Sequence, residues 1–326
     1  NNDTLTYTVV AKDATSGIKA ENENPVINYY IYLNGKKMKT GKVNVIDKKL
    51  DASGAYTEVV GNITISKDKA YDSNNLTIDV DTVDVAGNKS VSSADTTVTA
   101  KYDFTAPTAK LELQQGVDGD KWFTNGAVFT VTAQDNTSGI EKVGYTIKKA
   151  DGTYVEGSAD APVELITGVE SDAKEYTDSI SIPDMADYDT DNLTITTYTY
   201  DFAGNKTECS QTIKLDTTNP TADLTVNAGA NKDGWFNSGA TLSVKASDAT
   251  SGVDKVEYFV KASKDSNENL TSGTLTADTL QKSDNGDLTG TITIPKDAYY
   301  DSKNLYVETK TYDKAGNKTE CSQTIK

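Results

Sequence analysis

The segment Asp201-Phe202-Ala203-Gly204-Asn205-Lys206 is one of three copies of a single short pattern, and this repetition is the main evidence for the fold. The other copies of Asp-x-Ala-Gly-Asn-Lys are Asp84–Lys89 and Asp313–Lys318. They are spaced by a little over ~100 residues, the size of one small β-sandwich domain. Glycine and asparagine tolerate positive φ, so each copy predicts a tight hairpin turn between two strands.

Two further blocks keep the same order in each unit. Asp-x-Thr-Ser-Gly occupies Asp13–Gly17, Asp135–Gly139 and Asp248–Gly252. An Ile-x-Ile segment followed by Tyr-Asp-Ser/Thr-x-Asn-Leu occupies residues 63–76, 180–193 and 292–305. Three ordered blocks per unit indicate an internal repeat. We therefore expect three domains, at residues 1–102, 103–215 and 216–326, the first of which lacks its first strand.

Each unit has the pattern of short β-strands. In Leu193–Tyr200 the alternation places Leu193, Ile195, Thr197 and Thr199 on one face, as in a half-buried strand. Seven such strands and no helical periodicity predict an all-β chain of three tandem immunoglobulin-like β-sandwiches. Tyr188 lies just before this strand, and we expect its hydroxyl to bond to nearby backbone.

Short junctions with a proline connect the units. They are Asp103–Ala109 and Asp216–Ala222. Proline fixes its own φ and pushes the preceding residue toward an extended conformation. Stiff junctions of this kind predict that the three sandwiches form an elongated rod.

Composition excludes several classes of function. The net charge of −17, from 49 acidic and 32 basic residues, repels nucleic acid and attracts divalent cations. The chain has no histidine, and no carboxylate pair stands out as a catalytic acid and base, so we expect no enzyme. No stretch is suited to membrane insertion. Cys209 and Cys321 occupy equivalent places in two units, and we expect buried free thiols.

The motifs together resemble a known family. The Asp-x-Thr-x-Pro junctions, Trp-Phe-x-Asn/Ser-Gly at Trp122–Gly126 and Trp235–Gly239, and the two turn motifs resemble the bacterial immunoglobulin-like repeats of large secreted and surface proteins. The resemblance covers essentially the whole chain. It implies an extracellular bacterial protein, secreted or on the cell surface, whose repeats serve as adhesin stalks or as accessory domains beside carbohydrate-active enzymes. Some members of the family carry calcium at domain junctions.

The residues themselves also point to calcium. In an immunoglobulin-like topology the chain enters at the end of the sandwich where two of its loops lie, so the junction and both turn motifs meet there. The expected ligands are Asp103, Asp135 and Asp201 in the second unit and Asp216, Asp248 and Asp313 in the third, with Asp72 and Asp189 as additional ligands across the junctions. Three or four carboxylates make a hard oxygen site suited to calcium. The alternative is that each aspartate bonds only its own turn.

The expected function is a structural stalk of an adhesin-like surface or secreted protein, which presents a distal domain and has the flanking domains as partners. One alternative is a ligand-binding module, for a host glycan or protein, that uses the divergent loops at residues 153–174 and 264–287. Another is an accessory segment of a carbohydrate-active enzyme. Trp122 and Trp235 could stack on a sugar, but large aromatic side chains more often pack on their own domain.

Overall fold

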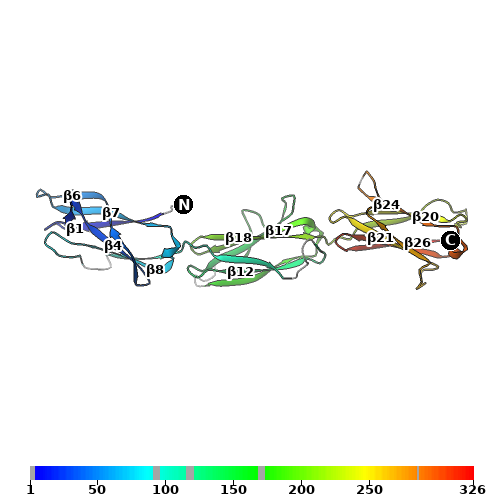
Figure 1. Cartoon of the computed structure of the whole chain (residues 1–326), viewed down its shortest axis with the longest axis horizontal. Coiled ribbons are helices and arrows are strands. Elements are labelled where there is room, and N and C mark those ends of the chain that lie inside the picture. The colour runs from blue at the N-terminus through cyan, green and yellow to red at the C-terminus, as the bar shows by residue number, and fades with distance from the viewer. Residues whose placement is uncertain (1–3, 91–95, 115–120, 168–172, 285) are drawn as a thin grey trace.

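The computed structural model describes residues 4–90, 96–114, 121–167, 173–284 and 286–326. Figure 1 shows three β-sandwiches that follow one another along the long axis of the view. Apart from strands, the described residues form three single-turn 3-10 helices, η1 (Lys69–Tyr71), η2 (Ala186–Tyr188) and η3 (Ala298–Tyr300). The predicted class, all-β with tandem immunoglobulin-like sandwiches, is confirmed.

The first sandwich contains strands β1 to β9. One sheet has the order β1-β7-β6, the other has the order β5-β4-β8-β9, and β2 pairs with β3 in a small ladder. The strands are β1 (Thr4–Lys12), β2 (Ala20–Glu21), β3 (Asn24–Pro25), β4 (Ile27–Leu33), β5 (Lys36–Lys42), β6 (Asn44–Leu50), β7 (Tyr56–Ser66), β8 (Ser73–Thr82) and β9 (Thr97–Tyr102).

The second sandwich contains strands β10 to β18. Its sheets have the orders β10-β12-β16 and β11-β18-β17-β13-β14, and β15 also pairs with β13. The strands are β10 (Thr108–Leu113), β11 (Trp122–Phe123), β12 (Ala127–Gln134), β13 (Ile140–Lys148), β14 (Tyr154–Glu156), β15 (Val163–Thr167), β16 (Glu175–Ile182), β17 (Thr190–Asp201) and β18 (Lys206–Leu215).

The third sandwich contains strands β19 to β26. Its sheets have the orders β19-β20-β24-β23 and β22-β21-β25-β26. The strands are β19 (Thr221–Val226), β20 (Ala240–Ser247), β21 (Val253–Lys261), β22 (Thr271–Thr276), β23 (Gln281–Lys282), β24 (Leu288–Ile294), β25 (Leu305–Asp313) and β26 (Lys318–Ile325).

Each sandwich has its core between its two sheets. In β17, Leu193, Ile195, Thr197 and Thr199 are buried and the residues between them are only partly so, as the alternation predicts. From the opposite sheet, Phe129 of β12 enters the same core and is fully buried. Burial of one such side chain contributes about 1.5–3 kcal/mol. Alternation places several apolar side chains of each strand in the core, and their summed burial stabilises the packing of one sheet on the other.

Strand β1 differs from its counterparts in the other two sandwiches. β12 lies between β10 and β16, and β20 lies between β19 and β24, whereas in the described part of the chain β1 has only β7 beside it. Its inward side chains are correspondingly less covered: Tyr7 and Val9 are half-buried, while Phe129 and Val131 at the same places are 0% exposed. Among the described residues, the outer side of β1 therefore has no partner strand.

The divergent segments in the middle of each unit are not plain loops. In the second sandwich β14 and β15 both pair with β13, and in the third β22 pairs with β21 and β23 with β24. These short strands extend the sheets because their backbone groups find partners there. Residues 168–172 and 285, which belong to the two predicted binding loops, lie outside the described residues.

Candidate metal centre

The Asp-x-Thr-Ser-Gly turn fixes one of the three predicted calcium ligands in the second sandwich and one in the third. Oδ1 of Asp135 accepts hydrogen bonds from the backbone N–H of Thr137 (3.1 Å) and of Gly139 (2.7 Å). Gly139 has φ +89°, a conformation that glycine adopts at little cost. Oδ1 of Asp248 makes the same two bonds in the third sandwich, to Thr250 and Gly252.

The Ala-Gly-Asn turn organises the second aspartate. Oδ1 of Asp201 accepts from the N–H of Asn205 (2.8 Å), and its Oδ2 accepts from the side-chain amide of the same residue (2.8 Å). Asp313 and Asn317 repeat the arrangement at 2.9 Å in both bonds. The turn joins β17 to β18 and β25 to β26, so the predicted hairpin is confirmed.

The junction supplies the third aspartate. Oδ1 of Asp216 accepts from the N–H of Thr218 (3.2 Å), and Oδ2 accepts from the N–H of Ser251 (3.0 Å) in the Thr-Ser-Gly turn. Asp103 bonds Thr105 and Ser138 in the same way. The junction aspartate is thereby fixed beside the turn of the sandwich that follows it.

These turns bring the carboxylates together in two clusters. The second-sandwich cluster is Asp103, Asp135 and Asp201, the third-sandwich cluster is Asp216, Asp248 and Asp313, and within each cluster one oxygen per residue lies within 4.8 Å of the others. Oxygens bound to one calcium ion at about 2.4 Å can be at most about 4.8 Å apart, so each set fits a common ion. The convergence that the sequence predicts is therefore present, and calcium binding itself stays a prediction.

Burial and mutual repulsion act on the carboxylates of both clusters. Burial raises the pKa of Asp201, and the carboxylates of Asp103 and Asp135 raise it further. Burial also raises the pKa of Asp216 and of Asp313, in both cases with a contribution from Asp248. Hydrogen bonds from the turns offset these shifts only in part. A divalent cation would remove the remaining repulsion.

The first sandwich has the same turns without a cluster. Asp13 accepts hydrogen bonds from Thr15, Ser16 and Gly17, and Asp84 accepts two from Asn88. These bonds hold the pKa of Asp13 and of Asp84 below its ordinary value, and no third carboxylate joins them among the described residues. A turn-forming role thus accounts for both motifs without metal.

One oxygen of the second-sandwich cluster, and one on the turn beside it, lack hydrogen-bond partners in the described part of the chain. Oδ2 of Asp135 accepts no bond, although both of its Oδ1 bonds are formed. The hydroxyl of Ser138 is buried and also has no partner, while its N–H is bonded to Asp103. Since buried polar atoms are normally satisfied, the missing partner of the Ser138 hydroxyl needs an explanation, and a bound ion beside Asp103 would give one.

Asp72 and Asp189 are placed on the junctions and not in the clusters. Oδ1 of Asp189 accepts from the N–H (2.9 Å) and hydroxyl (3.0 Å) of Thr217, and Oδ2 accepts from the hydroxyl of Thr218 (2.6 Å). Asp72 accepts from the N–H of Phe104 (2.7 Å) and from the hydroxyl of Thr105. Their expected role as metal ligands stays untested, and their observed contacts hold the junction to the preceding sandwich.

Sequence reasoning missed the asparagine of the Ala-Gly-Asn turn. The side-chain amide of Asn317 donates to the carbonyls of Asp216 (2.9 Å) and Thr218 (3.3 Å), and Asn205 does the same to Asp103 and Thr105. The recurrence of Asn at one position in all three turns was the available signal. Its partners lie about a domain length away in the chain, so no local pattern could identify them.

The expected bond of Tyr188 to nearby backbone is wrong. Its hydroxyl donates to Oε1 of Glu156 (2.5 Å), and the hydroxyl of Tyr145 donates to Oε2 of the same carboxylate (2.5 Å). Strand β14, which the sequence pattern did not reveal, brings Glu156 beside both rings and offers a charged acceptor. Cys209 and Cys321 are free thiols as expected, but they are half-buried and not fully buried; this partial burial raises the pKa of each.

Comparison with known proteins gives one family match. The profile described as bacterial Ig-like domain matches residues 101–217 and 215–326. No curated protein matches the chain. No helix among the described residues has the length and apolarity needed to cross a membrane.

Several solved structures resemble the chain. A tetra-tandem repeat in the extending region of a large adhesion protein is 19% identical, with 99% of this chain and 75% of that chain covered and a TM-score of 0.36. A Ca²⁺-stabilized adhesin of an Antarctic bacterium is 19% identical, with 98% and 68% covered and a TM-score of 0.28. The C-terminal domain of the Streptococcus pyogenes antigen I/II-family protein AspA is 12% identical, with 67% and 98% covered and a TM-score of 0.31. At these TM-scores the likenesses carry no conclusion about this chain.

Proposed function

The chain belongs to the bacterial Ig-like domain family, and on that premise we propose that it is a structural stalk. It would belong to a cell-surface or secreted adhesin-like protein of a bacterium. Its three domains, at residues 1–102, 103–215 and 216–326, would act as a spacer that presents a distal domain of the same protein. The work is mechanical and needs no catalytic residue. An extracellular location and flanking domains as partners belong to the same proposal.

The observation that carries this proposal is the double attachment of each junction. Asp189 of the second sandwich bonds Thr217 and Thr218, while Asn317 of the third sandwich bonds the carbonyls of Asp216 and Thr218. The first junction repeats the pattern. A segment of five residues that is bonded to the domains on both sides has little freedom to bend, which is what a spacer requires.

The strands at which the chain enters and leaves a sandwich also favour a load-bearing role. Thr207 donates to the carbonyl of Pro107 (2.5 Å) and Gln211 to that of Leu111 (3.4 Å), so β18 lies beside β10 and runs in the same direction. Tension along the chain would pull these two strands past each other. All cross-links between them would then be loaded together, a geometry that resists extension.

We further propose that both clusters bind calcium. In the second sandwich Asp103, Asp135 and Asp201 would hold the ion, and in the third Asp216, Asp248 and Asp313 would do so. The ion would neutralise carboxylates that burial and mutual repulsion now disfavour. Since Asp103 and Asp216 belong to the junctions, binding would also stiffen the join between neighbouring sandwiches.

Small-angle scattering with calcium and then with excess chelator tests the stalk. The test variant is Asp189→Ala, which removes three hydrogen bonds to the junction. The matched control is Asp301→Ala, at the same position of the third sandwich. The carboxylate of Asp301 accepts no hydrogen bond in the described part of the chain. We expect the maximum dimension to fall and the profile to show bending in the test variant alone. A compact or freely jointed wild-type chain would refute the proposal.

Ligand binding has weaker support. The two predicted binding loops contain one aromatic residue between them, Tyr154, so they offer little surface for stacking on a sugar. Specific binding of this chain on a glycan array would favour that alternative over the stalk.

A further inference from the structure

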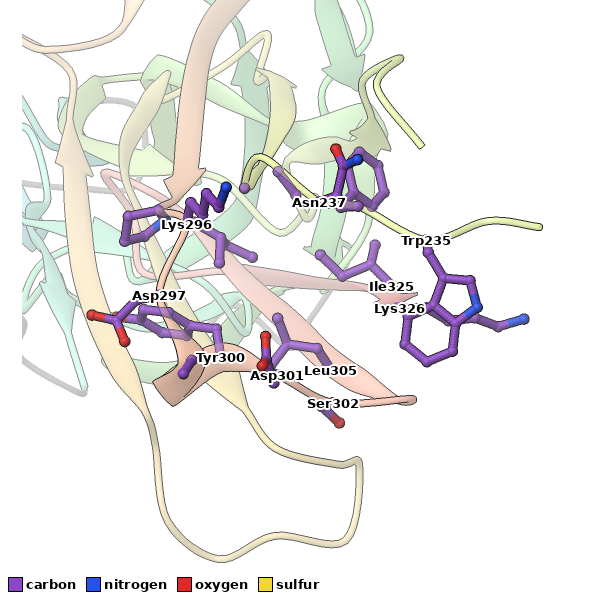
Figure 2. A pocket seen from close by; sticks show the side chains of 16 residues that line it. Trp235, Asn237, Lys296, Asp297, Tyr300, Asp301, Ser302, Leu305, Ile325 and Lys326 are labelled. Carbon is purple, nitrogen blue, oxygen red and sulfur yellow. The ribbon is translucent and has the colours of Figure 1, made fainter. Parts of the chain in front are cut away.

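Charge is unevenly distributed over this acidic chain. On the third sandwich the signs are mixed, as where Lys296 lines a pocket together with Asp297 and Asp301 (Figure 2). Residues 36–50 of the first sandwich, which form β5 and β6, instead contain six lysines and one aspartate, although the whole chain has a net charge of −17. All six lysines are exposed. This lysine edge comprises Lys36, Lys37, Lys39, Lys42, Lys48 and Lys49.

The lysine edge forms one side of the first sandwich. β5 is the outermost strand of one sheet, and β6 is the outermost strand of the other. Between them Val43 is buried and its N–H donates to the carbonyl of Ile27 (2.8 Å), so the chain crosses directly from one sheet to the other. Among the described residues neither strand has a partner on its outer side. The six lysines therefore lie along a single accessible side.

Four of the six ammonium groups have no carboxylate partner in the described part of the chain. Lys42 pairs with Glu21 and Lys49 with Glu58, both at 2.5 Å. Two of the remaining lysines lie over tyrosine rings, a contact that leaves the ammonium group open to an acidic partner. The four lysines without an ion pair are Lys36, Lys37, Lys39 and Lys48. The lysine edge thus carries positive charge that the first sandwich does not compensate locally.

Protection of the sheet edges explains the lysine edge only in part. Lysines on outer strands commonly prevent unwanted pairing between sheets. However, β22, which occupies the place of β5 in the third sandwich, has no charged residue at all. In addition, the lysine edge exposes three apolar side chains, those of Met38 (45%), Ile46 (57%) and Leu50 (53%), which a purely repellent edge does not need. Apolar side chains among charges of one sign favour contact with an acidic partner.

The second sandwich has the opposite charge on the equivalent side. Residues 150–182 contain eight acidic residues and one lysine, and that lysine, Lys174, donates to the carbonyl of Thr137 (2.7 Å). β14 occupies the place of β5 at the edge of its sheet, and β16 is the outermost strand of the other sheet. The exposed carboxylates of this acidic side are those of Asp151, Asp160, Glu164, Glu175 and Asp178. Two domains of the same chain therefore carry complementary surfaces.

We propose that the lysine edge binds the acidic side of the second sandwich in another copy of the chain. The two surfaces belong to successive sandwiches (Figure 1), so the bound copies lie side by side with an offset of one domain. Opposite charges bring the surfaces together, and Met38, Ile46 and Leu50 lose contact with water there. A stalk needs no contact between copies, so this association is a property in addition to the proposed function.

Sedimentation velocity of the whole chain, at a fixed calcium concentration, tests the contact. The wild type should associate with rising protein concentration at about 50 mM NaCl, and its dissociation constant should be about tenfold weaker or more at about 500 mM NaCl, because salt screens exposed charges. The test variant reverses the four lysines without an ion pair and should remain monomeric; it carries Lys36→Glu, Lys37→Glu, Lys39→Glu and Lys48→Glu. The control reverses four exposed lysines of the third sandwich that form no ion pair among the described residues, and it should associate as the wild type does; it carries Lys264→Glu, Lys282→Glu, Lys296→Glu and Lys303→Glu.

A second variant identifies the partner surface by exchange of charge. It carries Asp160→Lys, Glu175→Lys and Asp178→Lys, and it should also be monomeric alone. Its mixture with the lysine-reversed variant should associate, because opposite charges then face each other again. A wild type that is monomeric at low salt would overturn the proposal, as would a lysine-reversed variant that associates like the wild type or a mixture that stays monomeric. If the wild type bound inorganic polyphosphate through the same lysines without self-association, the lysine edge would be a site for anionic polymers and the proposal would be wrong.

Discussion

Replacing Asn317 with alanine is the most direct test of how the junction is held. The side-chain amide of Asn317 donates to two carbonyls of the junction, those of Asp216 and Thr218, and to the buried carboxylate of Asp313. Each neutral bond is worth about 1 kcal/mol net, and the bond to the carboxylate about 1.5–3 kcal/mol. Because the amide has two N–H groups, its longest bond, to Thr218 (3.3 Å), shares a hydrogen, and the sum is about one neutral bond and one bond to the carboxylate. We therefore expect Asn317→Ala to lower the unfolding free energy of the third sandwich by about 2.5–4 kcal/mol, equivalent to at least ~10 °C in melting temperature.

The chain contains a matched control in the first sandwich. Asn88 occupies the same place in the same turn, but among the described residues its side-chain amide donates to Asp84 alone (2.7 Å), at an exposed site. Asn88→Ala should cost about 1 kcal/mol. Native-state hydrogen exchange measures the opening of β26 and β8 separately, so both variants can be read in the whole chain. Equal losses in the two sandwiches would refute the reasoning, because the junction would then contribute nothing.

Three further predictions concern the clusters and the turns. Chelator should lower the calorimetric melting temperatures of the second and third sandwiches. It should leave the melting temperature of the first sandwich unchanged, because that sandwich has no carboxylate cluster among its described residues. An equal shift in all three sandwiches would contradict calcium binding at the two clusters. In chelator, Asp201, Asp216 and Asp313 have a pKa that folding raises. The stability they contribute is fully present below the ordinary value of 3.8 and is lost as pH rises through the raised pKa. These groups should therefore increase the unfolding free energy of the second and third sandwiches as the pH is lowered. The lowered pKa of Asp13 and Asp84 acts in the opposite direction in the first sandwich: its contribution is present above the ordinary value of 3.8 and is lost as pH falls through the lowered pKa. Melting scans from about pH 7 down to about pH 2.5 should therefore separate the two trends. Gly126→Ala should destabilise the second sandwich in urea by more than about 2 kcal/mol, because its Cβ would lie 2.2 Å from the carbonyl oxygen of Ile182. The control is Gly204→Ala, which has a similar positive φ but open space around it and should cost only about 1 kcal/mol. Equal losses of stability in the two variants would show that the clash with Ile182 is not the cause.

Features that repeat within the sequence were the predictable part of the fold. The alternation in Leu193–Tyr200 identified the buried face of β17, and the Asp-x-Ala-Gly-Asn copies identified a hairpin in the second and third sandwiches. Both are local, because the period of a strand and the φ angles of a turn depend on neighbouring residues. The convergence of the three aspartates followed from adding the topology of the sandwich to these local signals.

Contacts between distant segments were the unpredictable part. The bond of Asn317 to the junction, that of Tyr188 to Glu156, and the pairing of β22 with β21 each join residues whose relative position depends on the finished fold. Single-sequence patterns do not specify such partners, since many polar residues could serve equally well. The segment that contains β14 was misjudged for this reason, and the error about Tyr188 followed from it.

The parallel course of β10 and β18 also bears on how the chain would lengthen once its load is exceeded. Thr207 and Gln211 tie β18 to β10, and Thr319 and Gln323 tie β26 to β19 in the same way. Because such bonds are loaded together, a sandwich should open in one step and not strand by strand. Each opened domain would release roughly 3.3–3.6 Å of extended chain per residue, so the protein would absorb a sudden pull by lengthening in discrete steps while its neighbouring sandwich stays folded.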